Sequence, residues 1–166
     1  MKNLKDIILE HFEYSNFSIY ERLHINKDTG NHHYNYHPKT RDELKELVDK
    51  LIEERGYNAD LNDIDTSEIT DMTTLFNNSK FNGDISEWNV SNVKYMMYMF
   101  HNSKFTGENG DISNCDVSNV KDMMYMFCDS KFNGDISNWN VRNDVDMSYM
   151  FNGNPLEKNP PKWHKE

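Results

Sequence analysis

A fourfold internal repeat constrains the fold of this chain more than any other feature of its sequence. Similar segments begin at Asp60, Asp84, Asp111 and Asp135, at intervals of 24, 27 and 24 residues. The second and third copies read DISEWNVSNVKYMMYMFHNSKFTG and DISNCDVSNVKDMMYMFCDSKFNG, and the fourth is shorter. Short repeats that cannot bury their apolar faces alone do so by stacking on their neighbours. The sequence therefore predicts a solenoid of about four coils over residues 57–151.

Each repeat contains a pattern typical of a short helix. Val93, Met96, Met97 and Phe100 follow the spacing i, i+3, i+4 and i+7, and Ser91 before them suits a helix N-cap. Because flexible methionines fill irregular gaps between repeats, we interpret them as core residues rather than as a cofactor site. We expect six apolar side chains to be buried against the next coil: Met96, Met99, Phe100, Met123, Met126 and Phe127.

The segment DIS, which is DLN in the first repeat, predicts a short strand in every coil. Ile85, Ile112 and Ile136 would point inward, so the residues on either side of each isoleucine would face outward. Together the two patterns predict an α/β solenoid.

The pattern DISxWNVSNVxxMxxMF, followed by FNGDIS, resembles the repeat of the BspA-like leucine-rich-repeat family of the DUF285 type, over residues 60 to about 151. This resemblance implies a leucine-rich-repeat-like α/β solenoid with one short strand and one short helix per coil. Members of that family occur on bacterial surfaces, in mycoplasmas and in phages, and are usually discussed as adhesion or protein-interaction modules.

Residues 1–56 predict a small α/β head that closes the first coil. Thr40 and Glu43 predict a capping box at the start of a helix, and Gly56 predicts its end. A second short helix is expected over residues 4–14, with two strands around the turn KDTG between them. At the other end, residues 152–166 predict a C-terminal cap or tail, with Trp163 folded back over the last coil.

No catalytic or metal motif stands out. Four histidines cluster in sequence, but no cysteine accompanies them and their spacing matches no standard zinc site: His24, His32, His33 and His37. The chain contains no P-loop, nucleophile elbow or dinucleotide fingerprint. The two cysteines, Cys115 and Cys128, predict no disulfide framework. We therefore expect no enzymatic activity, no catalytic residue, no metal and no cofactor.

The negative charge belongs to the repeats. Residues 57–151 hold fifteen acidic and six basic side chains, which gives nine of the ten net negative charges of the chain. Direct nucleic-acid binding needs a basic surface, whereas an acidic surface attracts a basic protein partner. We find no signal peptide and no apolar run long enough to span a membrane, so the sequence predicts a cytoplasmic protein.

The outward positions beside the three isoleucines are the candidate binding residues: Asp84, Ser86, Asp111, Ser113, Asp135 and Ser137. Stacked coils would place their carboxylates in a row that could meet basic groups of a partner. A competing interpretation is that each aspartate accepts backbone N–H groups within its own turn. The leading functional hypothesis is a non-enzymatic protein-interaction module, and the alternative is a small acidic phage-type inhibitor that mimics nucleic acid to block a nuclease or defence complex.

Overall fold

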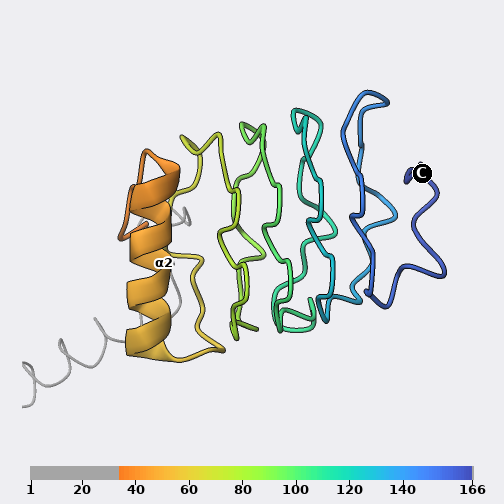
Figure 1. The fold of residues 1–166 in the computed structure, drawn as a ribbon. Helices are drawn as coiled ribbons and strands as arrows, with labels where there is room; N and C mark the ends of the chain where they lie inside the picture. Colours follow the sequence, from red (N-terminus) through yellow and green to blue (C-terminus); the bar gives the residue numbers. More distant parts are fainter. Residues whose placement is uncertain (1–33, 166) are drawn as a thin grey trace, which may run out of the picture.

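The computed structural model of the protein describes residues 34–165. The expected helix over residues 4–14, the expected hairpin around the KDTG turn, and His24, His32 and His33 lie outside this range. Within the described part, one helix stands at one end of a stack of coils, and the C-terminus lies at the other end (Figure 1). No helix of the described part is long and apolar enough to cross a membrane.

The single described helix is α2, which spans Arg41–Arg55 as the capping signals predicted. The Thr40 side chain accepts the Glu43 backbone N–H at 3.2 Å. The Glu43 carboxylate accepts the N–H of Lys39 at 2.7 Å, one residue before the position of an ordinary capping box. Gly56, at φ 90°, donates its N–H to Ile52 and ends the helix.

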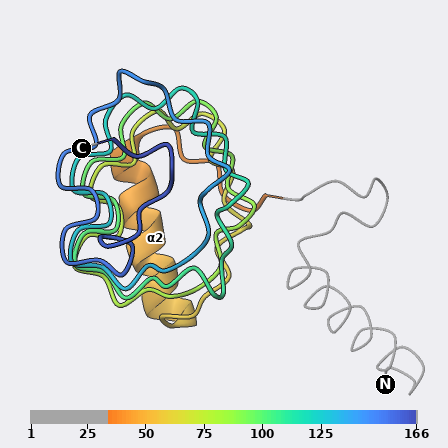
Figure 2. The ribbon, with the colours of Figure 1, turned by 90° about the vertical axis from the view of Figure 1, so that its right-hand side faces the viewer.

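Successive repeats stack side by side and nearly superimpose when viewed along the stack (Figure 2). Isolated parallel β-bridges join equivalent residues of neighbouring coils, in the pairs Asp60–Asp84, Asp71–Tyr95, Tyr95–Asp122 and Asp122–Asp146. A further bridge joins Tyr36 to Ile64, so the segment before α2 runs beside the first coil. The repeat interval of the sequence is therefore the interval of the stack.

The prediction of one strand and one helix per coil is wrong. Within residues 34–165 there is no helix besides α2 and no extended strand, and the coils consist of turns linked by single bridges. This structure does not fit a leucine-rich-repeat solenoid.

Hydrogen bonding explains why the methionine segments do not form helices. In the second coil the N–H groups of Met96, Tyr98 and Phe100 donate to carbonyls of the third coil instead of to the residue four positions earlier. Tyr98 and Asn102 have φ values of 56° and 49°, which a right-handed helix does not allow. Turns whose N–H groups donate to carbonyls of the next coil take the place of the helix.

The DIS segments fail as strands for a related reason. The Asp84 carboxylate accepts the N–H of Ser86, and Trp88 donates its N–H to the carbonyl of Ile85. These two bonds close consecutive turns, so the chain bends where a strand would have to stay extended. Ile85, Ile112 and Ile136 are nevertheless buried, as predicted from the sequence.

Apolar side chains fill the stack as continuous columns. Phe76, Phe100, Phe127 and Phe151 stack face to face, with successive ring centroids 5.3, 5.6 and 6.0 Å apart. A parallel column contains the rings of residues 81, 105 and 132, 6.2 and 6.0 Å apart. The six residues predicted to be buried are each at most 3% exposed. Met97, which the helix pattern placed inside, is only half-buried.

Candidate functional site

The predicted binding residues occupy equivalent turns in successive coils. In each turn the aspartate Oδ1 accepts the backbone N–H of the serine two residues later at 2.9 Å, in the pairs Asp84–Ser86, Asp111–Ser113 and Asp135–Ser137. Asp60 makes the same bond, also of 2.9 Å, with Asn62 in the first coil. We call Asp60, Asp84, Asp111 and Asp135 the aspartate row.

The turn bonds engage one oxygen of each carboxylate in the row and leave the side chains accessible. Asp60, Asp111 and Asp135 are exposed, and Asp84 is half-buried. Hydrogen bonds from Ser137 lower the pKa of Asp135, so this carboxylate stays ionised well into acid. The row therefore combines a role in the turns with an exposed line of negative charge.

A column of tyrosines forms a second surface feature. The rings of Tyr98, Tyr125 and Tyr149 stack with centroids 4.8 and 4.9 Å apart. All three have positive φ values, between 56° and 58°, a conformation that is rare for bulky residues. Tyr149 ends the column and is 56% exposed. The tyrosines recur plainly in the sequence, but the expectation of a helix concealed that they form one column.

One group of side chains has ligand types that suit a metal. Single atoms of His101, Cys128 and Asp129 lie within 4.8 Å of one another. The His101 Nδ1 lies 3.0 Å from the Asn77 side-chain oxygen. Burial and the neighbouring Asp129 carboxylate raise the pKa of the Cys128 thiol to about 11. Because thiol ligands bind metals as thiolates, a metal bound here would have to displace the proton of Cys128.

Of the four histidines that cluster in sequence, His37 alone lies in the described part. Its Nδ1 is 3.2 Å from an Asp65 carboxylate oxygen, and the side chain is 61% exposed. The contact pairs the ring with the first coil.

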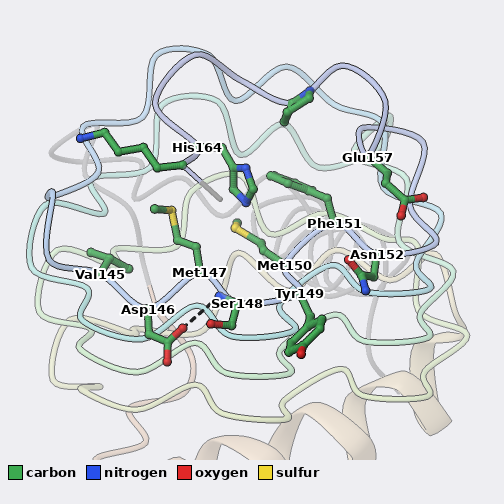
Figure 3. Close-up of a pocket in the computed structure, with 12 residues that line it drawn as sticks. Val145, Asp146, Met147, Ser148, Tyr149, Met150, Phe151, Asn152, Glu157 and His164 are labelled. Atoms are coloured by element: carbon green, nitrogen blue, oxygen red, sulfur yellow. Dashed lines mark hydrogen bonds between the residues drawn. The ribbon is translucent and has the colours of Figure 1, made fainter.

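A pocket of about 490 Å³ lies between the last coil and the C-terminal tail (Figure 3). Residues 145–152 form its floor, and Glu157, Pro160, His164 and Lys165 line it from the tail. The His164 ring stands edge-on to Phe151 with centroids 5.0 Å apart. Nothing in the sequence indicated this pocket, because the pocket depends on how far the tail returns over the coil.

Residues 147–152 of the pocket floor belong to the last step of a hydrogen-bond ladder that runs in one direction. In each earlier coil, four alternate N–H groups of the segment equivalent to residues 147–153 donate forward to carbonyls of the next coil, at 2.7–3.0 Å. No further coil follows the last one within residues 34–165. The N–H groups of Met147, Tyr149 and Phe151 have no acceptor among residues 34–165, whereas Gly153 donates to the Glu157 carboxylate at 3.3 Å.

The tail covers the other half of the same coil. Trp163 stacks on Trp139 with centroids 6.0 Å apart, and its Nε1 donates to the Ile136 carbonyl at 2.8 Å. Trp88 and Trp139 make the equivalent bond, 2.9 Å long, to carbonyls of the coil before them. The expectation that Trp163 folds back is therefore confirmed, and it continues the tryptophan column by one more step.

Comparison with known proteins places the chain in a family without assigning an activity. Residues 43–163 match the family described as Mycoplasma protein of unknown function, DUF285. No curated protein and no solved structure matches the chain. The matched range contains most of α2, all four coils and most of the tail, so the resemblance seen in the repeats is confirmed: the chain belongs to the DUF285 family.

Proposed function

We propose that the protein is a non-enzymatic protein-interaction module whose acidic surface docks a basic partner. The aspartate row carries this proposal, because it repeats one carboxylate at the same place in four successive coils, exposed in three of them and half-buried in the second. Single exposed charge pairs contribute about 1 kcal/mol or less, so a repeated row suits a partner with several basic groups. The unpaired cysteines Cys115 and Cys128 agree with a reducing compartment, and we place the interaction in the cytoplasm.

The experiment tests the row by removing its charge without removing its turns. Asn89 already performs the same turn role, since its Oδ1 accepts the Ser91 N–H at 3.1 Å. The triple change Asp84→Asn, Asp111→Asn and Asp135→Asn should therefore keep the melting temperature nearly constant. We expect partner affinity and association rate to fall, most strongly at low salt.

A matched control removes the same charge elsewhere. Glu46, Glu53 and Glu54 are exposed on α2, and their change to Gln should leave partner binding unchanged. Partners are captured from a cell lysate with each of the three proteins and measured again after purification. Equal loss in both variants would show that only net charge matters. Equal retention would assign binding to another surface, and a nuclease released by salt would favour nucleic-acid mimicry.

A further inference from the structure

The last coil presents backbone donors without the matching acceptors. The backbone N–H groups of Met147, Tyr149 and Phe151 have no acceptor within residues 34–165. The carbonyls of the same three residues already accept the N–H groups of residues 150, 152 and 154, at 3.0–3.3 Å. An ordinary strand edge alternates donors and acceptors. Over residues 147–151 this edge, which we call the donor edge, has donors only. Beside it, the Val145 carbonyl takes the place of the Lys121 carbonyl, which accepts the Asp146 N–H at 3.1 Å.

The earlier coils show what such an edge binds. The donor segment of the third coil is covered by residues 146–152, which supply the carbonyls of Asp146, Ser148, Met150 and Asn152. The same pairing stacks Tyr149 on Tyr125 at 4.9 Å and Phe151 on Phe127 at 6.0 Å. The natural occupant is thus a turn-rich polypeptide segment with alternate carbonyls on one side and an aromatic ring beside the tyrosine column.

We propose that the donor edge and its pocket bind a segment of a partner protein that adds one further turn-rich coil to the stack. Its alternate backbone carbonyls accept the N–H groups of Met147, Tyr149 and Phe151, and an aromatic side chain stacks on Tyr149. The pocket beside these groups has a volume of about 490 Å³. The proposal rests on the interaction function proposed above, but it does not require the aspartate row.

A second copy of the chain does not fit this edge. Two C-terminal ends brought together would set donors against donors. The acceptor end of the stack is covered by α2, where Arg41 Nε already donates to the Thr73 carbonyl at 3.0 Å. Complementary acceptors must therefore come from a different polypeptide.

The test uses the full chain and a labelled peptide with the sequence of residues 144–153, DVDMSYMFNG, which copies the natural occupant. Fluorescence anisotropy should show saturable binding, and a scrambled peptide should not bind. Changing Tyr149→Ala should weaken binding about tenfold, which corresponds to an aromatic pair worth about 1.4 kcal/mol. The matched control Tyr95→Ala removes another exposed tyrosine, 45% exposed and outside the pocket, and should have no effect.

Amide NMR and hydrogen exchange locate the contact. Peptide binding should shift and protect the amides of Met147, Tyr149 and Phe151. Absence of binding, equal binding of the scrambled peptide, or shifts elsewhere would overturn the proposal. Protection of these amides in the dilute free chain would assign the edge to residues 1–33, and protection that grows with concentration would assign it to a second copy. Either result also overturns it.

The two proposals can fail separately. If the peptide does not bind but the aspartate changes still weaken partner capture, only the donor edge is refuted. If the peptide binds and the aspartate changes have no effect on capture, the acidic surface is refuted and the donor edge stands.

Discussion

The two ends of the stack are closed to different extents. At the N-terminal end, Leu44, Val48 and Leu51 of α2 are fully buried, and α2 lies across the first coil (Figure 1). At the C-terminal end, Trp163 covers the Trp139 side of the last coil, while residues 145–152 border an open pocket. The N-terminal end of the stack is therefore covered by α2, whereas the C-terminal end is covered only in part.

The chemistry of the two ends differs as well, because the ladder formed by residues 147–153 and their equivalents in earlier coils runs in one direction. The first coil offers carbonyls to its outer side, and the Arg41 guanidinium of α2 donates to one of them. The last coil offers N–H groups, and the Glu157 carboxylate accepts one of them. A cation at the acceptor end and an anion at the donor end each suit the group they meet. The two ends of this ladder thus meet chemically different caps.

Removing one cap at a time should give the largest difference in folding and stability between the two ends. A chain that begins at Ala59 loses α2 and exposes the apolar face of the first coil, so it should aggregate or lose cooperative unfolding. A chain that ends at Gly153 loses only the tail and should stay folded with a lower melting temperature. Size-exclusion chromatography and thermal melts measure both. A soluble monomer with a cooperative melt from the first chain would show that α2 is not a required cap.

Two single substitutions in one phenylalanine column, one in the middle of the stack and one in the last coil, compare the stability of the two places. Phe100→Ala should reduce the free energy of unfolding by about 3–5 kcal/mol, as for other buried aromatic residues. Phe151→Ala should cost less, because Phe151 stacks on a phenylalanine on one side and meets the His164 edge on the other. Denaturant unfolding gives both values. Equal costs would show that the tail packs as tightly as a coil.

The two charged caps should contribute smaller and unequal amounts. Arg41→Met removes bonds to the Thr73 carbonyl and the Thr74 hydroxyl and should cost about 1–3 kcal/mol. Glu157→Gln keeps an acceptor for the Gly153 N–H and should cost less than about 0.5 kcal/mol. The same unfolding experiment compares them. A larger loss for Glu157→Gln would contradict the view that the donor end is held mainly by Trp163.

Acid should have the smallest effect and should act on the turns. Hydrogen bonds from Ser118, Ser137 and Ser148 lower the pKa values of the aspartates two residues before them: Asp116, Asp135 and Asp146. A carboxylate with a lowered pKa in the folded state stabilises that state fully above its unfolded value of about 3.9. This contribution is lost as the pH falls through the lower folded value.

The melting temperature should therefore stay level between about pH 7 and 5 and fall below about pH 4. Changing Asp135→Asn keeps the acceptor and removes the titration, so it should flatten part of this fall. An unchanged acid profile in that variant would show that the carboxylate contributes nothing beyond its neutral bond.

Local sequence signals predicted α2 because a helix end depends on a few adjacent residues. Thr40 and Gly56 are sufficient to mark the ends of the helix wherever it packs. The inward isoleucines and the phenylalanine column were predictable for a similar reason, since repeated apolar positions must be buried in any stacked arrangement. The division into a head, four repeats and a tail stays a prediction, since the structure describes the head only from residue 34 onward.

The sequence by itself determined the repeat, its length and its apolar core. It did not determine the conformation inside each coil, because apolar residues spaced three and four apart suit both a helix and a series of turns. Only the tertiary structure decided between them. A similar neighbour at a fixed distance offers alternate N–H groups of the segment, from Met96 to Asn102, an acceptor in the next coil, and these bonds between coils replace the helix. The donor edge and its pocket follow from that choice, since they exist only where the stack of coils ends.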